Sequence, residues 1–365
     1  MKTILIAHNY SEISFAAMSF HLANYLAEKG NIVVFISHQP YFKNEKVVEF
    51  KNGKLFIISW SSQKRPTGFK DVFWFYRIYK KHKPDVVIGH FVGSNIAILL
   101  SKLLSYGKVK TFEYYHTLSA QILTDIKINS FRQKVLFLRK KCFYNFFCDT
   151  IICPSDMAKE DLKLYYGLDH GFVVLNPMID RHLQKNIFKN DKININFLGR
   201  IDESKGILEL IEAFKIYIDK FPNTKIVLNI AGNGSLLGRV IENIANYHSI
   251  TFIGSLPYNK IDNYLNAGIF TIIPSKFDNL PTVGLESIMN QTPLLISNNT
   301  GLTKYLTDNY DCYKFDFTVN DIVLMFEKVE MNIENAANMG LNARMTFLEN
   351  FSIEKYCETI KKLVS

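Results

Sequence analysis

The sequence lacks several features that would each point to a definite class of protein. Its longest apolar runs, such as 96–100, fall far short of the ~20 residues that a membrane-spanning helix needs. Its five cysteines are odd in number and show no Cys-x-x-Cys spacing, so we expect neither a disulfide framework nor a zinc site. The first segment, 3–7, is apolar but ends early at polar residues, which predicts a β-strand and not a signal peptide. A reduced, cytoplasmic chain is the simplest interpretation.

Length, charge and aromatic content narrow the class further. At 365 residues the chain is too long for one ordinary core, so we expect two domains. Hydrophobic residues make up 48% and charged residues 21%, a balance typical of a globular and not a disordered protein. The formal net charge of +9 suits nucleic acid, an anionic membrane or an anionic small molecule, and composition does not choose among these partners.

Strand and helix patterns alternate along the chain with one interruption. From 3–7 to a strand at 172–175 the alternation predicts a doubly wound α/β sheet. Residues 176–192 are polar and contain Pro177, and we interpret them as a linker. The alternation then restarts at 193–198 and leads to a last helix at 353–364. Two such halves place a cleft between them, which is the usual position of a ligand in this class of fold.

The stretch 277–295 holds the most informative pattern. Asp278 is followed eight positions later by Glu286, and Pro281 between them suits the first turn of a helix because proline has a fixed φ and no N–H. The free N–H groups and the dipole of a helix start attract phosphate. Glu286 is then placed to accept a hydrogen bond from a sugar or ribose hydroxyl. By itself Asp278 is better explained as a helix cap, but its combination with Glu286 and a basic loop favours a ligand role.

Three more polar loops follow strands in the second half. They are GRIDESKG with Arg200 and Lys205, then GNG from Gly232 to Gly234, then Gly254, Ser255 and Leu256. Loops at the carboxyl ends of parallel strands converge on one site. Arg200 and Lys205 bracket a helix start, so their cations are suited to grip a diphosphate. The alternative for both is a surface salt bridge with a neighbouring acid such as Asp202.

Four runs in this half, FLGRIDESKGILELIEAF, IAGNGS, ITFIGSLP and IIPSKFDNLPTVGLESIMNQTPLLIS, resemble the retaining GT-B glycosyltransferases of family 4 (glycosyl transferases group 1). Landmarks in the first half, such as KPDVVIGH and LNPMID, agree with this resemblance. The resemblance implies two Rossmann-like domains facing across a cleft. Residues 1–177 would bind the acceptor and 178–351 the nucleotide-sugar donor, with a final helix at about 352–365 packing back on the first domain.

The resemblance also assigns roles to residues of the second half. It implies that Asp278 contacts hydroxyls of the donor sugar, that Glu286 contacts the nucleotide ribose, and that Arg200 and Lys205 bind the diphosphate. The remaining contacts would come from Gly232 in the cleft, from Gly254, Ser255 and Leu256 beside the base, and from the N–H groups of Thr282 and Val283 at the phosphates. The sequence departs from the family at Asp278, where Glu is usual, and at Ile13 and Ser14, which stand where the family often has two glycines.

Two features of the first half complete the assignment. His116 follows a strand, where the family often has a histidine that hydrogen-bonds the sugar 6-hydroxyl; a structural histidine explains it equally well, and is the better explanation for His90. Residues 73–83 and 131–147 mix aromatic and basic side chains. We interpret both segments as amphipathic helices, either with a solvated face or docked peripherally on an anionic membrane.

The function that the resemblance implies is transfer of a sugar, with retention, from a UDP- or GDP-linked donor to a glycan or lipid-linked acceptor in surface polysaccharide assembly. We expect no cofactor and no metal, since there is no Asp-x-Asp pair in a suitable loop and Arg200 and Lys205 can neutralise the leaving diphosphate. One alternative is an epimerase or hydrolase of the same fold, which would need more acids than Glu12 and Glu113 in the first half. The other is a basic nucleic-acid-binding protein, against which the acids among the loops argue. We expect the enzyme in the cytoplasm, either free or at the inner face of the membrane.

Overall fold

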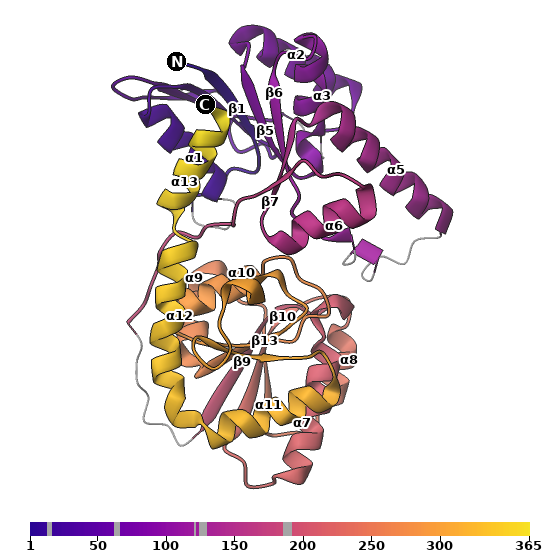
Figure 1. The fold of residues 1–365 in the computed structure, drawn as a ribbon, viewed down its shortest axis with the longest axis vertical. Helices are drawn as coiled ribbons and strands as arrows, with labels where there is room; N and C mark the ends of the chain where they lie inside the picture. Colours follow the sequence, from indigo (N-terminus) through magenta and orange to yellow (C-terminus); the bar gives the residue numbers. More distant parts are fainter. Residues whose placement is uncertain (13–16, 62–65, 120–121, 124–129, 185–191) are drawn as a thin grey trace. The chain divides into compact units, whose positions relative to one another are not determined.

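The computed structural model describes residues 1–12, 17–61, 66–119, 122–123, 130–184 and 192–365, and the chain forms two compact units (Figure 1). Unit 1 contains Met1–Ser119, Ile128–Pro177 and Ile353–Ser365, and unit 2 contains Ala120–Lys127 and Met178–Ser352. Each unit has a sheet that is mostly or wholly parallel and carries helices on both faces. The predicted α/β class with two doubly wound sheets is confirmed.

Unit 1 is built on an eight-stranded sheet, as far as the described residues show, with the order β3-β4-β2-β1-β5-β6-β7-β8. Its strands are β1 (Thr3–Ala7), β2 (Ile32–Ser37), β3 (Lys46–Glu49), β4 (Lys54–Ser59), β5 (Val86–His90), β6 (Lys110–Tyr114), β7 (Thr150–Cys153) and β8 (Gly171–Val173). In this described part the pairing is parallel except between β3 and β4. The chain order reverses between β1 and β5, which makes this the switch point of the sheet.

Two helical layers cover this sheet. Within the described residues, the helices of unit 1 include α1 (Ala17–Glu28), α2 (Phe69–His82), α3 (Asn95–Leu104), α5 (Ser130–Phe147), α6 (Asp156–Tyr166) and α13 (Ile353–Val364). α1 and α13 bury their apolar residues in one core, and α2, α3, α5 and α6 contribute to the core on the other face. A hydrogen bond of 2.5 Å between the hydroxyls of Tyr356 and Tyr114 links α13 to β6 of the sheet.

Unit 2 has a wholly parallel sheet of six strands within the described residues, in the order β11-β10-β9-β12-β13-β14. The strands are β9 (Ile193–Arg200), β10 (Ile226–Asn233), β11 (Ile250–Gly254), β12 (Phe270–Ile273), β13 (Leu294–Ser297) and β14 (Cys312–Phe315). The helices are α7 (Ile207–Lys220), α8 (Leu237–Ile244), α9 (Tyr258–Ala267), α10 (Thr282–Met289), α11 (Val319–Met331) and α12 (Ala336–Asn350). α7, α8 and α11 share the main core on one face, whereas α10 packs against α9 and α12.

Some predicted elements differ from the structure. The strands β3 and β14 were not predicted: β3 is a four-residue edge strand with all its side chains exposed, so it lacks the apolar alternation of a buried strand. The helix predicted from Lys205 begins at Ile207, because Gly206 adopts a left-handed φ of 65° and interrupts it. Ile13 and Ser14 lie outside the described residues. The last helix has the predicted bounds.

Candidate functional site

The polar loops of unit 2 lie at the carboxyl edge of its sheet. β9 pairs with β10 on one side and with β12 on the other, and the chain order reverses between β9 and β12. A crevice at such a switch point is the usual ligand site of an open parallel sheet. Arg200 is the last residue of β9, Lys205 lies in the turn that follows this strand, and Asp278 lies in the loop after β12. The structure therefore places these residues on both sides of the switch point.

Lys205 and Asp278 form an ion pair between these two loops. The Lys205 Nζ lies 2.5 Å from the Asp278 Oδ2, and the two side chains are only 17% and 11% exposed. Lys205 ends a 3-10 turn, η2 (Glu203–Lys205), and is followed by Gly206. A Cβ at Gly206 would collide with the carbonyl oxygen of Pro274, so glycine allows the two loops to approach this closely. A half-buried cation and an anion therefore face each other at the switch point.

Asp278 does not cap the helix that follows. α10 has Pro281 at its N-cap position, with no capping bond from a side chain. Pro281 thus stands one position before the helical turn in which we expected it. The N–H groups of Thr282 and Val283 have no hydrogen-bond partner among the residues that the structure describes, as is usual for the first turn of a helix. These donors are open to an anion.

Arg200 is paired with a neighbouring acid. Its Nη1 lies 2.6 Å from the Asp202 Oδ2, and its side chain is 53% exposed. Partial burial opposes ionisation of Asp202, but the backbone N–H and the hydroxyl of Ser235, together with the Arg200 and Lys205 cations, outweigh it and lower the pKa of this carboxyl. The salt bridge considered for Arg200 is therefore present. It leaves the guanidinium at the carboxyl end of β9, at the surface.

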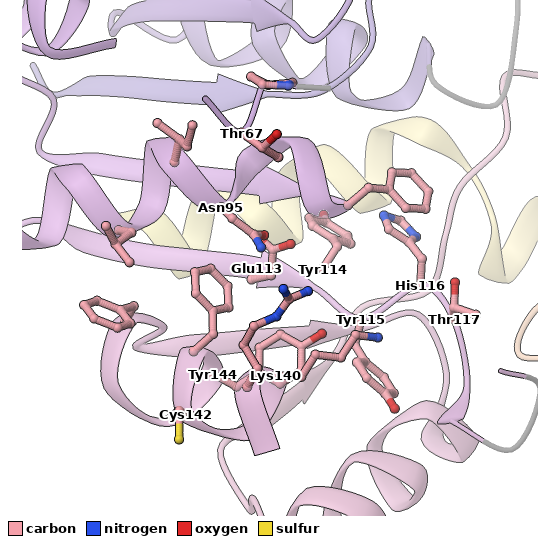
Figure 2. Close-up of a pocket in the computed structure, with 17 residues that line it drawn as sticks. Thr67, Asn95, Glu113, Tyr114, Tyr115, His116, Thr117, Lys140, Cys142 and Tyr144 are labelled. Atoms are coloured by element: carbon pink, nitrogen blue, oxygen red, sulfur yellow. The ribbon is translucent and has the colours of Figure 1, made fainter. Parts of the chain in front are cut away.

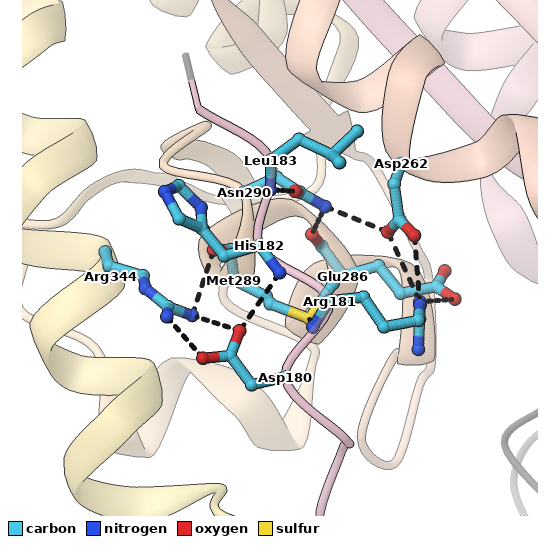
Figure 3. A network of polar contacts seen from close by, with 9 residues as sticks. All are labelled: Asp180, Arg181, His182, Leu183, Asp262, Glu286, Met289, Asn290 and Arg344. Carbon is cyan, nitrogen blue, oxygen red and sulfur yellow. Dashed lines mark hydrogen bonds and ion pairs between the residues drawn. The ribbon is translucent and has the colours of Figure 1, made fainter.

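Glu286 is buried in a polar network that the sequence did not reveal (Figure 3). Its Oε1 lies 3.3 Å from Nη2 of Arg181, whose guanidinium also bonds both carboxylate oxygens of Asp262 on α9 at 2.9 and 3.3 Å. Burial raises the pKa of Glu286 to about 7; Arg181 opposes this rise and Asp262 adds to it. The Oε2 of Glu286 accepts no hydrogen bond from the described residues. This oxygen is the one available to a ligand.

The glycines near the ends of β10 and β11 are required by the backbone conformation. Gly232 has a φ of 146°, and a Cβ there would collide with the carbonyl oxygen of Gly199 on the paired strand. Gly254 has a φ of 86°, a conformation that favours glycine, and Ser255 next to it is exposed while Leu256 is half-buried. None of these residues makes a hydrogen bond or ion pair with Lys205, Asp278 or Glu286 in the described structure.

In unit 1, histidines gather at the ends of three adjacent strands. His8 follows β1, His90 ends β5 and His116 follows β6. The His8 and His90 rings stack at 4.3 Å, and the His90 Nδ1 lies 3.1 Å from the His116 Nε2. Burial lowers the pKa of His116 to about 3 and those of His8 and His90 well below the ordinary value. These imidazoles are therefore neutral at physiological pH and act as hydrogen-bonding groups, not as cations.

A pocket of about 530 Å³ adjoins this cluster (Figure 2). Its walls come from α3, β6 and α5 and are mainly apolar and aromatic, with His116 and Lys140 among the lining residues. Glu113 on β6 also lines it, is 3% exposed, and accepts one hydrogen bond, from Ser94 Oγ at 2.8 Å. Burial raises the pKa of Glu113 to about 8, so this carboxyl is largely protonated at neutral pH. The pocket thus presents a neutral acid to a ligand.

The two helices that mix aromatic and basic residues are α2 and α5, and only α5 differs from the amphipathic pattern that we expected. α2 buries Phe75 alone among its described side chains and exposes Phe73. α5 was expected to be amphipathic, but its apolar side chains are not confined to one face: Phe131 is 72% and Leu138 is 63% exposed. An exposed helix that mixes apolar and basic side chains is suited to a partner surface.

The described residues contain neither a candidate metal site nor a candidate membrane-spanning helix. No group of three or more His, Cys, Asp or Glu side chains there has the geometry to hold a metal ion. Within the same residues, no helix combines the length and the apolar character that crossing a bilayer requires.

Sequence families match almost the whole length of the chain. Two doubly wound units are the architecture of the GT-B fold, and the family matches add that the chain is a glycosyltransferase. Residues 17–182 match the family Glycosyltransferase Family 4, and residues 178–346 match Glycosyl transferases group 1. The chain belongs to the GT-B glycosyltransferases of family 4.

Curated relatives are similar over most of the chain at low identity. An uncharacterised glycosyltransferase of Methanocaldococcus jannaschii is 23% identical over 71% of this chain and 66% of its own length. The capsular polysaccharide biosynthesis glycosyltransferase CapM of Staphylococcus aureus is 24% identical over 78% of each chain. An α-1,4-N-acetylgalactosaminyltransferase of Campylobacter jejuni, whose name specifies an undecaprenol-diphosphate-linked acceptor, is 24% identical over 94% of this chain and 92% of its own.

Solved structures confirm the fold. Sucrose-phosphate synthase of Thermosynechococcus elongatus superposes with a TM-score of 0.76 at 14% identity, covering 100% of this chain and 98% of that one. Anabaena HepE in complex with UDP and glucose gives 0.73 at 10% identity, with 100% and 99% coverage. At such identities the likeness establishes the GT-B fold and does not assign a substrate.

Proposed function

We propose that this glycosyltransferase binds a UDP- or GDP-linked sugar on unit 2 and transfers the sugar, with retention, to a glycan or lipid-linked acceptor bound through unit 1. The observation that carries the proposal is the Lys205–Asp278 pair at the switch point of the unit 2 sheet, next to the N-terminus of α10. Carboxylate, ammonium and free helix N–H groups together match a sugar diphosphate, which has hydroxyls to donate and charge to neutralise.

Each end of the donor has a group suited to it. The diphosphate would be bound by Lys205, by Arg200 and by the N–H groups of Thr282 and Val283. A sugar hydroxyl would donate to Asp278, which gives up part of its contact with Lys205 when the phosphate arrives. Ribose hydroxyls would donate to the open Oε2 of Glu286. Gly254, Ser255 and Leu256 would lie beside the base, and Gly232 would line the site.

For the transfer step we propose that the leaving diphosphate itself takes the acceptor's proton. The bond between the anomeric carbon and the diphosphate oxygen breaks, the acceptor oxygen forms the new bond on the same face, and its proton passes to the departing phosphate. Lys205 and Arg200 would stabilise the charge that develops on that phosphate, so the proposal needs no metal. His116, which is neutral because of its burial, would donate or accept a hydrogen bond at the sugar.

The acceptor is proposed to belong to surface polysaccharide assembly. Support comes from CapM, named for capsular polysaccharide, and from the Campylobacter relative, named for an undecaprenol-diphosphate acceptor. A lipid-linked acceptor would require contact with a membrane, and the exposed apolar and basic side chains of α5 suit the surface of an anionic bilayer. We therefore place the enzyme at the cytoplasmic face of a membrane.

A thermal-shift panel of UDP, GDP and ADP tests this function first. A nucleotide that binds the native state at 100 times its Kd stabilises that state by about 2.7 kcal/mol. We expect one of UDP or GDP to raise the melting temperature in the wild type and much less in Lys205→Ala. If none of the three nucleotides shifts the melting temperature, the donor assignment is wrong; if only ADP does so, the base is wrong but the site remains.

A further inference from the structure

The first residues of unit 2 are fixed against the end of α10 (Figure 3). The backbone N–H of Arg181 donates to the Met289 Sδ at 3.2 Å, and the N–H of Leu183 donates to the Asn290 side-chain oxygen at 3.0 Å. Two residues of the predicted linker are therefore held by the end of the helix that carries Glu286. These hydrogen bonds fix the backbone from which the Arg181 side chain extends.

The Arg181 guanidinium lies between two carboxylates. Its Nε and Nη2 bond the two oxygens of Asp262, at 2.9 and 3.3 Å, and the same Nη2 bonds Glu286 at 3.3 Å. The Tyr258 ring lies 4.8 Å from the guanidinium carbon, and Asn290 donates to Asp262 at 2.9 Å. With its side chain 24% exposed, Arg181 has a defined position and not a mobile surface one.

The titratable groups that face Glu286 are Arg181 from the linker and Asp262 and Tyr258 from α9. Asp262 and burial both disfavour the ionised form of Glu286, and Arg181 is the group that favours it. Removing the arginine would leave two acids in one partly buried site, where like charges cannot both ionise readily. The charge state of Glu286 near neutral pH therefore depends on Arg181.

We propose that Arg181 is a positioning residue for nucleotide binding, which keeps the Glu286 carboxylate ionised and turned so that its second oxygen accepts a hydrogen bond from ribose. Arg181 touches no part of the donor in this scheme and acts through Glu286. The inference rests on the proposed function, because ribose binding by Glu286 belongs to that proposal. It adds a residue that the sequence analysis did not assign to the donor site, since Arg181 stands in the linker segment.

The test is the pH dependence of donor binding in Arg181→Gln. Isothermal titration would use UDP-glucose and GDP-mannose between pH 6 and pH 9, because a diphosphate esterified at both ends does not titrate in this range and the ribose contact does not depend on the sugar. In the wild type, affinity should rise with pH through about 7, where Glu286 ionises. In Arg181→Gln the midpoint should move upward by about one unit or more, with binding at pH 7 weaker by roughly fivefold or more, and this loss should recover at higher pH.

Three further variants make the result decisive. Arg181→Lys keeps the cation and should restore most of the wild-type midpoint. Asp262→Asn removes the like charge and should move the midpoint downward, a shift opposite in sign to that of Arg181→Gln. Arg344→Gln is the matched control: this arginine belongs to the same network but pairs with Asp180 at 2.5 Å and not with Glu286, so its midpoint should stay at the wild-type value.

The outcomes separate this inference from the proposed function. If Glu286→Ala binds both nucleotide sugars as well as the wild type, the ribose assignment fails and the role of Arg181 fails with it. If Glu286→Ala weakens binding but Arg181→Gln keeps the wild-type midpoint, or loses affinity equally at every pH, then Arg181 has only a structural role. Should Arg181→Gln not fold, a midpoint in Asp262→Asn that does not move downward overturns the inference.

Discussion

Replacing Glu113 by Gln should change how the stability of unit 1 depends on pH. The carboxyl is 3% exposed, and burial raises its pKa from the ordinary 4.5 to about 8. The native state therefore binds the proton more tightly than the unfolded chain, and stability falls as pH rises from 4.5 towards 8. Each unit of pH inside this window costs about 1.4 kcal/mol.

Between pH 6 and pH 8 the free energy of unfolding of the wild type should fall by about 2 kcal/mol because of this group. The fall is smaller than two full steps because the dependence on pH weakens as the pH approaches the pKa of Glu113 in the native state. Glutamine keeps the size of the side chain and an oxygen for Ser94, which donates at 2.8 Å, but it has no proton to lose. An isosteric change is needed because the site is tightly packed: even a Cβ at Gly89 would collide with the Glu113 carboxyl.

The assay is urea unfolding at pH 6 and pH 8, monitored by tryptophan fluorescence. Both tryptophans, Trp60 and Trp74, lie in unit 1, so the signal reports on this unit alone. Histidines whose pKa is lowered by burial contribute a slope of opposite sign, but they are the same in both proteins and cancel in the difference. A stability difference between variant and wild type that is equal at the two pH values would refute the reasoning.

Four other substitutions, one of them with a matched control, have defined outcomes. Lys205→Ala and Arg200→Ala should each reduce sugar transfer roughly 100-fold or more by removing charge stabilisation from the diphosphate, with circular dichroism unchanged; near-normal turnover in both would contradict the site. Tyr356→Phe should lower the free energy of unfolding of unit 1 by about 1–2 kcal/mol, because the buried Tyr114 hydroxyl loses its partner, and an unchanged urea midpoint would speak against that contact. Leu138→Asp on α5 should weaken sedimentation with phosphatidylserine vesicles, whereas Leu324→Asp on α11, at a leucine of similar exposure in unit 2, should not; equal binding by both variants would exclude α5 as the membrane surface.

The sequence predicted the parts of the fold that depend on local pattern. The last helix has the bounds that we predicted, 353–364. The sequence also predicted that the loops after parallel strands lie at one edge of the sheet. Lys205 and Asp278 meet because the strands before their loops, β9 and β12, are neighbours in that sheet.

What the sequence could not predict depends on long-range pairing. Arg181 stands in a polar segment with other basic residues, and nothing local shows that it pairs with carboxylates on α9 and α10. The helix-cap interpretation of Asp278 failed because Pro281 occupies the N-cap position itself. His8 was not recognised because the stacking of His8 on His90 becomes visible only when β1 and β5 are adjacent.

The return of α13 to unit 1 has a consequence for the order of folding during synthesis. Tyr356, Cys357, Ile360 and Val364 complete the core that α1 begins, yet they are made after the whole of Met178–Ser352. At ordinary elongation rates this interval is roughly 10 to 35 seconds. Throughout that time the nascent first unit leaves its α1 face incomplete, with apolar surface available to chaperones, and by its end every segment of unit 2 has been made.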